Sequence, residues 1–317
     1  MYTCMIHIQH PEMRLIVLSD LHLERPENLA LHYTVDDGKN IEIDLSVYID
    51  SVDSKRPDII CLCGDIGDPA LPAYAAMLTA CAKACRVATL VILGNHECYG
   101  RTHEDTIVMV EALCRKCDSR LIFLDGQQRP SVRILDYMFI GTTLWSSVLP
   151  EQVRDVQTFV SDFRCIKDWD VIRQKSQFQQ DVSTLRRELA ACRELGLRAV
   201  VLTHHVPLIN LGSEKHQSSN LKSAFCSDLS TVMDEYRDVL RLWLYGHDHH
   251  SSVYHFPGSS LYVVSNQFGT SPTLTGDSRF RSDLCIDLSK ALNTDMIFQK
   301  AVHRYPAPNP RALAHRR

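Results

Sequence analysis

The stretch LIVLSDLHLE, residues 15–24, decides the fold, because four apolar residues are followed directly by a polar segment that contains Asp20 and His22. An apolar β-strand that stops at a polar residue delivers that side chain to the carboxyl edge of a sheet, where α/β folds build their sites. Asp20 and His22 are two residues apart, so in extended geometry their side chains share one face and can reach a single ion. The stretch predicts a strand that ends in two metal-ligand side chains.

The same pattern recurs later in the chain. Five further residues of these types lie at or near the ends of apolar runs: Asp65, Asn95, His204, His247 and His249. Taken singly, an Asp or His at a strand end is usually a cap, a turn former or a solvated group, whereas the joint spacing favours ligands. Asp65 has two carboxylate oxygens with which to bridge two cations. Mixed oxygen and nitrogen ligands suit Zn, Mn, Fe or Co.

Apolar runs alternate with helical patterns, which predicts a layered sheet covered by helices. Strands are expected at residues 15–18, 59–63, 89–93, 121–124, 199–203, 242–245, 253–255, 261–264 and 284–286. Helices are expected at residues 45–52, 70–85 and 103–117. Residues 131–135 and 137–141 flank Asp136 and predict a hairpin, hence some antiparallel pairing.

Residues 145–196 differ in sequence pattern from the rest of the chain. They are polar and irregular at first and then have a strongly helical pattern. Four apolar residues recur there at spacings of three and four and form one stripe: Val182, Leu185, Leu189 and Cys192. Such a stripe is expected to pack against the sheet. We expect one elaborated catalytic domain at residues 1–303, in which 145–196 are a helical cap or an elaboration, followed by a basic flexible tail at 304–317.

Composition sets the broad class. The chain has 317 residues, 45% of them hydrophobic, and its 34 basic and 38 acidic side chains give a net charge of −4, which offers no global attraction for nucleic acid or anionic lipid. The N-terminal residues lack the pattern of a secretory signal, and no apolar stretch approaches the roughly 18 residues of a membrane helix. The twelve cysteines, including the lone CxxC of Cys114 and Cys117, are therefore expected to be free thiols in a cytoplasmic protein.

Five blocks of this sequence resemble the calcineurin-like metallophosphoesterase superfamily in order and content: SDLHLE at 19–24, GDIGD at 64–68, GNHE at 94–97, THH at 203–205 and GHDH at 246–249. They span about three quarters of the chain. The resemblance implies an α/β fold of the four-layer α+β type, in which a β-sandwich of two mixed sheets is flanked by helices and carries a dinuclear metal site at the strand ends. Segments GTTLW at 141–145, SDF at 161–163 and SDL at 227–229 look like a little-characterised, bacterial-type branch.

The resemblance also assigns roles. It implies one ion bound by Asp20, His22, Asp65 and His249, and a second bound by Asp65, Asn95, His204 and His247. His96 matches the family's catalytic histidine, and Asp68 matches the aspartate that pairs with it in many members. At residues 265–270 the chain has SNQFGT, where the family pattern implies an arginine-containing stretch.

The expected reaction is hydrolysis of a phosphomonoester or phosphodiester of a small substrate such as a nucleotide. Two ions about 3.5–4 Å apart would clamp the phosphate and acidify a bridging water, which would attack as hydroxide. His96 would protonate the leaving oxygen as general acid, oriented by Asp68. His96 could equally orient a ligand or contact phosphate, and Asp68, which precedes Pro69, is also a natural turn or cap residue.

Asn95 and His96 are the expected substrate contacts. His205, Lys215 and Lys222 are weaker candidates, the lysines on a long loop at 206–226 that has the character of a functional lid. Exposed lysines on a solvated loop are at least as common. His205 is expected to support a ligand rather than to bind metal, because neighbours in an extended chain point to opposite faces.

Three alternatives remain. A nuclease would require a basic groove and an accessory region for nucleic acid, and a protein phosphatase would require further arginines, one of them directly after Asp68. A catalytically silent scaffold of the same fold would have lost ligands, and none is missing. The expected partner is a small phosphorylated substrate, with nucleic acid not favoured and no membrane.

Overall fold

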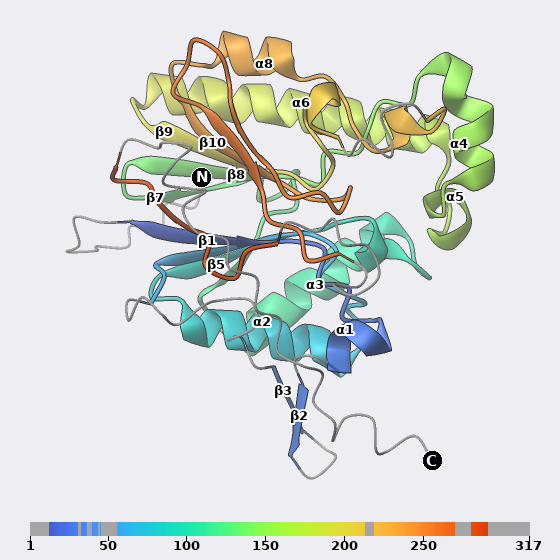
Figure 1. Ribbon diagram of the computed structural model, residues 1–317, viewed down its shortest axis with the longest axis vertical. Coiled ribbons are helices and arrows are strands. Elements are labelled where there is room, and N and C mark those ends of the chain that lie inside the picture. The colour runs from blue at the N-terminus through green and yellow to red at the C-terminus, as the bar shows by residue number, and fades with distance from the viewer. Residues whose placement is uncertain are drawn as a thin grey trace.

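Two β-sheets lie face to face, and helices cover both outer faces (Figure 1). The structure is a computed structural model and describes residues 13–30, 33–36, 40–43, 45, 56–212, 219–269 and 280–290. Both sheets contain parallel and antiparallel pairs. These layers confirm the predicted sandwich of two mixed sheets flanked by helices.

The first sheet has the strand order β13-β1-β4-β5-β6. Its strands are β1 (Arg14–Leu18), β4 (Ile59–Cys63), β5 (Ala88–Ile92), β6 (Leu121–Phe123) and β13 (Cys285–Asp287). Strands β1, β4, β5 and β6 run parallel, so their carboxyl ends meet at one edge. The central strands are buried on both faces, which is why they are continuous apolar runs rather than alternating ones.

The second sheet has the order β11-β12-β10-β9-β8-β7. Its strands are β7 (Ser131–Ile134), β8 (Tyr137–Gly141), β9 (Arg198–Leu202), β10 (Leu240–Tyr245), β11 (Val253–His255) and β12 (Tyr262–Ser265). Strands β7 and β8 form the predicted hairpin. A separate antiparallel pair, β2 (Tyr33–Asp36) and β3 (Asn40–Ile43), was not predicted.

Most of the described helices lie on the outer side of one of the sheets, whereas α4 and α5 project to one side of the sandwich (Figure 1). They are α1 (Pro26–Ala30), α2 (Pro72–Ala84), α3 (His103–Cys117), α4 (Val153–Phe159), α5 (Asp162–Cys165), α6 (Val171–Glu194) and α8 (Ser230–Glu235). Local sequence explains where several begin. Pro72 occupies the first turn of α2, and the side chains of Thr102 and Asp170 accept backbone N–H groups at the starts of α3 and α6.

Three apolar layers hold these elements together. One lies between the sheets, a second joins α2 and α3 to the first sheet, and a third joins α6 and α8 to the second sheet. Leu185, Leu189 and Cys192 are buried in the third layer together with residues of β8 and β9. The predicted stripe therefore does pack against the sheet. Most of the helix expected at 45–52 lies outside the described residues, as does the tail at 304–317.

Two expectations from composition can be compared with the structure. Among the described residues, no helix is both long enough and apolar enough to cross a membrane. The described cysteines, Cys114 and Cys117 among them, are all free thiols.

Candidate metal centre

The seven candidate ligands converge at the edge where parallel strands of both sheets end. Asp20 and His22 follow β1, Asp65 follows β4, Asn95 follows β5, His204 follows β9, and His247 and His249 follow β10. The loops are tied together by backbone hydrogen bonds, for example from the N–H of Asp20 to the carbonyl of Gly64. The fold therefore brings into contact residues that lie as much as 227 positions apart in the chain.

The ligand atoms form two groups that face each other. In one, Nε2 of His22 lies 2.9 Å from Nε2 of His249, which is 3.6 Å from a carboxylate oxygen of Asp20. In the other, Nε2 of His204 lies 3.1 Å from Nδ1 of His247. These are two of the described clusters whose atoms lie close enough to share a cation.

Asp65 lies between the two groups. Its Oδ2 is 3.8 Å from Nε2 of His22 and 3.4 Å from Nε2 of His204. Two atoms that both bind one ion at about 2.1 Å are separated by roughly 3–3.5 Å, and most of these distances are close to that range. The donor set therefore fits a pair of cations that share the Asp65 carboxylate.

The backbone at the ligands is unusual. Five of the seven residues have positive φ angles: Asp20 (56°), His22 (47°), Asp65 (54°), His247 (84°) and His249 (56°). Non-glycine residues seldom adopt this left-handed conformation, and it persists where the surrounding structure enforces it, commonly at functional sites. The turns after β1, β4 and β10 thus direct these five side chains inward at a cost in local backbone energy.

Two glycines allow the ligand loops to touch. A Cβ atom on Gly94 would lie 2.1 Å from Oδ1 of Asp65, and one on Gly64 would lie 2.5 Å from the backbone nitrogen of Gly94. Gly64 also has a φ of +84°, which other residues rarely adopt. The absence of a side chain at Gly64 and Gly94 therefore permits the close approach of the two ligand loops.

Hydrogen bonds outside the centre orient two of the imidazole rings. Nδ1 of His22 lies 3.0 Å from Oε1 of Glu24, and Nδ1 of His204 lies 2.9 Å from the carbonyl oxygen of Cys63. Both oxygens can only accept, so each Nδ1 carries a proton and Nε2 is the ring atom that is directed towards the metal position. Glu24 and the carbonyl group of Cys63 thus orient the two rings for binding a cation.

The protonation of the His204, His247 and His249 rings is also compatible with metal binding. Burial lowers the pKa of His249 to about 4 and holds the pKa of His247 well below its usual range, so both rings are neutral near pH 7. Burial alone would lower the pKa of His204, but the charges of Asp65 and Asp20 raise it to about 10. A cation bound beside these carboxylates would displace that proton.

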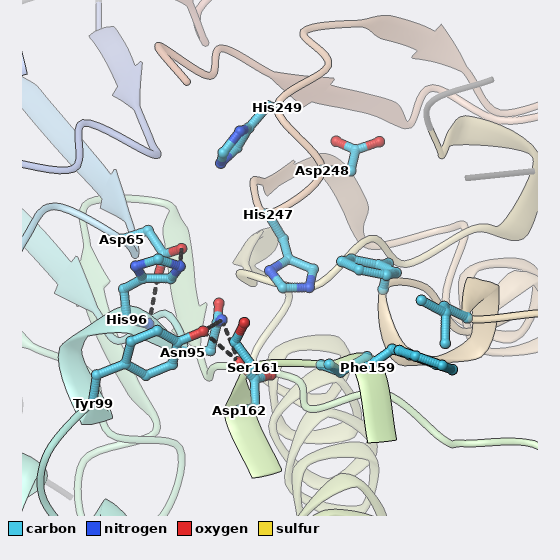
Figure 2. A pocket seen from close by; sticks show the side chains of 13 residues that line it. Asp65, Asn95, His96, Tyr99, Phe159, Ser161, Asp162, His247, Asp248 and His249 are labelled. Atoms are coloured by element: carbon cyan, nitrogen blue, oxygen red, sulfur yellow. Dashed lines mark hydrogen bonds and ion pairs between the residues drawn. The ribbon is translucent and has the colours of Figure 1, made fainter. Parts of the chain in front are cut away.

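Asn95 is held by a residue of α5. Oδ1 of Asp162 accepts hydrogen bonds from Nδ2 of Asn95 at 2.8 Å and from the hydroxyl of Tyr99 at 2.8 Å (Figure 2). The amide nitrogen of Asn95 is thereby fixed towards Asp162, and its Oδ1 lies 3.0 Å from Nε2 of His204. Asp162 decides which end of the Asn95 amide faces the centre. Asp162 belongs to the SDF segment at 161–163, and its contact with Asn95 could not be predicted from the sequence.

His96 has a different partner from the one predicted. Its Nδ1 lies 3.1 Å from Oε1 of Glu24, the oxygen that also accepts from His22, and Tyr99 stacks on the ring at 4.3 Å. Asp68 instead binds Arg101 at 2.7 Å and accepts the backbone N–H of Ala70. The expected pairing of Asp68 with His96 is therefore replaced by Glu24, and Asp68 has the turn role that its position before Pro69 also allowed.

Glu24 and its two histidines are strongly coupled by charge. Burial would raise the pKa of Glu24, but the hydrogen bonds and charges of His22 and His96 hold it at about 2. Burial would likewise lower the pKa of His96, but the charges of Asp65 and Glu24 and the hydrogen bond to Glu24 raise it to about 9. His96 can therefore carry a proton at neutral pH.

Two further residues that sequence analysis did not assign hold the loops in place. The buried carboxylate of Glu97 accepts backbone N–H groups from Asp65 and Gly94 at 3.0 and 2.9 Å. Gln267 accepts the N–H of His249 at 2.6 Å and donates to Asp248 at 2.8 Å. Gln267 belongs to the segment that departs from the family pattern, so at that point the chain has a loop-positioning amide instead of an arginine.

A cavity of about 230 Å³ opens beside the centre. Asn95 and His96 both line it. His205 is buried and packs on His247 and Trp145, with ring centroids 4.1 and 5.3 Å apart, so it supports a ligand instead of contacting the cavity. Lys222 lines a different hollow, and Lys215 lies outside the described residues.

The family model described as calcineurin-like phosphoesterase matches residues 13–251. The matched region is about three quarters of the chain and contains all seven candidate ligands. The chain belongs to the calcineurin-like phosphoesterase family. This phosphoesterase is a phosphoric ester hydrolase, as the five sequence blocks predicted.

Individual relatives of the phosphoesterase are distant. An uncharacterized protein of Acanthamoeba polyphaga mimivirus is 26% identical over 195 residues, which are 56% of this chain and 66% of the relative. Phosphopantetheinyl hydrolase from Mycobacterium tuberculosis has a TM-score of 0.55 and 13% identity over 82% of this chain and 90% of that one. A dimetal phosphatase from Danio rerio has a TM-score of 0.48 and 15% identity, over 81% and 88%. At such identities the likeness of the mycobacterial structure shows the fold alone.

Proposed function

We propose that the phosphoesterase hydrolyses a phosphomonoester or phosphodiester of a small substrate with the help of two divalent or transition metal ions, of which Mn, Fe, Zn and Co suit the ligands. One ion would be held by Asp20, His22, Asp65 and His249, and the other by Asp65, Asn95, His204 and His247. The observation that carries the proposal is the position of Asp65, whose Oδ2 faces a histidine of each group at 3.8 and 3.4 Å. Ions bound there would polarise the phosphate and make an attacking water more acidic.

His96 is the proposed general acid. Its Nδ1 is occupied by the hydrogen bond to Glu24, so Nε2 is the atom that gives a proton to the leaving oxygen. The ring lines the cavity and is partly exposed there. A cation at Asp65 would offset the charge of that carboxylate, whereas Glu24 would continue to favour the protonated ring.

The test compares an aryl phosphate monoester with a bis-aryl diester on purified protein loaded with Mn, Zn, Fe or Co. We expect about two ions per chain, Asp65→Asn to lower metal content at both positions, and His96→Asn to keep the metal while turnover falls about 100-fold, most for poor leaving groups. Asp20→Ala is the control for hydrolysis that depends on the centre. A metal-loaded wild type that hydrolyses no phosphate ester would contradict the proposal and favour a scaffold.

A further inference from the structure

The cavity beside the candidate metal centre has two chemically different sides. One side carries polar groups and rings of the centre, among them Asp65, His96 and His247. The other is an apolar wall that consists of Phe159, Val160, Leu221 and Phe225. Figure 2 shows Phe159 across the cavity from His96 and Tyr99, with His247 between them. A ligand with its phosphate at the centre would therefore extend onto apolar side chains.

The apolar wall is built by two segments outside the sheets. Phe159 ends α4 and is 65% exposed, and Leu221 and Phe225 come from the segment that follows β9. The ring of Phe225 also lies 5.2 Å from that of His247 at an angle of 32°, so the wall is continuous with the centre. A single exposed phenylalanine is common on protein surfaces, but four apolar residues at the mouth of a reactive site suggest a binding surface.

The charge of the cavity limits what else can bind. Among the described residues that line it, none is a lysine or an arginine, whereas Asp162 and Asp248 both contribute carboxylates. A second phosphate on the substrate would lie near these carboxylates with no cationic side chain of the lining to bind it. The volume of about 230 Å³ is also below the roughly 300–1,000 Å³ of sites for drug-sized ligands. The cavity suits one phosphate and a compact leaving group.

We propose that the apolar wall binds the leaving group, and that the preferred substrates are esters of a single phosphate with a compact apolar or aromatic alcohol. This inference rests on the proposed function and adds the substrate class. Phe159 is the main specificity residue because it is the most exposed member of the wall.

The experiment uses three esters that share one reacting bond: 2-phenylethyl phosphate, ethyl phosphate and ethane-1,2-diol bisphosphate. With the metal-loaded full chain, kcat/KM should be about tenfold higher for the phenylethyl ester than for the ethyl ester, and lowest for the bisphosphate. Phe159→Ala should reduce the phenylethyl-to-ethyl ratio about tenfold, and Phe159→Lys should raise the relative rate on the bisphosphate. Val108→Ala, an exposed apolar residue on α3, is the matched control and should leave the ratios unchanged.

A second measurement separates this inference from the proposed function. Calorimetry with the non-hydrolysable 2-phenylethylphosphonate and ethylphosphonate should give a Kd ratio of about ten in wild type and near one in Phe159→Ala. Hydrolysis of all three esters with equal kcat/KM, or ratios that Phe159→Ala does not change, would overturn the inference and leave the proposed function standing. No hydrolysis of any ester, with the phosphonate ratio intact, would overturn the proposed function alone.

Discussion

At the residue scale, hydrogen-bonding partners decide what each side chain at the centre can do. The seven candidate ligands could be predicted from the sequence, because each follows an apolar run and such runs are easily recognised. It did not predict Glu24 as the partner of His96, since the two are 72 positions apart and only folding brings them within 3.1 Å. Asp162 was missed for the same reason, because it meets Asn95 from 67 positions away.

Glu24 should tune the acidity of His96. Glu24→Gln removes the negative acceptor that helps to raise the pKa of His96 to about 9. A general acid works below its pKa, so the alkaline limb of the kcat profile should move to lower pH by at least about 1 unit, and kcat near pH 10, above both pKa values, should fall about tenfold. The measurement is a pH–rate profile on an alkyl phosphate. Glu27→Gln, at an exposed position of α1, is the control, and an unmoved limb would show that Glu24 has no part in the proton transfer.

Asp162 should govern metal affinity through Asn95. In Asp162→Asn the amide of Asn95 loses the carboxylate that fixes its orientation, so its oxygen is no longer held towards His204. Residues that orient a ligand typically contribute 10–100-fold in affinity, and we expect a loss of about tenfold for the ion at that position. Titration of metal-free protein with Mn²⁺ or Zn²⁺ measures it. Asp155→Asn, on α4, is the matched control, and equal affinities in the two variants would refute the positioning role.

At the scale of elements, the periodicity of the chain was sufficient for the long helices and the strands of both sheets. Helix α3 has the predicted bounds, and β4 is the apolar run 59–63 itself. The short helices α4 and α5 were not predicted, because seven and four residues show no clear period. They are nevertheless the elements that carry Phe159 and Asp162 to the cavity. The elements that line the cavity are therefore the ones that sequence patterns predict least well.

The contact between the loops after β4 and β5 should tolerate no side chain at Gly94. A methyl group there would lie 2.1 Å from Oδ1 of Asp65, so Gly94→Ala must displace the carboxylate that the two ligand groups share. We expect a loss of about 1–3 kcal/mol in the free energy of unfolding, together with reduced metal content. Chemical denaturation and elemental analysis measure these effects. Gly212→Ala is the control, because its added methyl group would lie 3.8 Å from the carbonyl oxygen of Ile209, and a Gly94→Ala protein with normal metal content would contradict the expectation.

At the scale of the whole molecule, the stacking of two sheets could be predicted only from the resemblance of five sequence blocks to a family. Local sequence patterns do not show which strands pair. The chain's departure at SNQFGT was visible in the sequence, but the use of Gln267 to hold the loop of His249 was not. Global stability depends on buried groups that no motif marks, and Asp181 of α6 is one of them. Its carboxylate accepts the backbone N–H of Trp145 at 3.2 Å.

Asp181 should make the stability of the whole fold depend on pH. Burial raises its pKa to about 6, above the roughly 3.9 of an unfolded chain. Its stabilising contribution is therefore complete below about pH 4 and is lost as the pH rises through 6, which amounts to about 3 kcal/mol. The free energy of unfolding should be measured for wild type and Asp181→Asn between pH 4 and 8. As the pH rises over this range, the variant should become more stable relative to wild type by about 3 kcal/mol. Asp234→Asn, exposed on α8, is the control, and a difference that does not vary with pH would contradict the assignment.

The candidate ligands are divided between the two sheets, and this division bears on the order of events in folding. Asp20, His22, Asp65 and Asn95 follow strands of the first sheet, whereas His204, His247 and His249 follow strands of the second. Neither sheet alone offers a complete set, and loop closure over such sequence separations is slow. Capture of the ions would then be a late step in maturation, and metal uptake during refolding would report when the halves of the sandwich have docked.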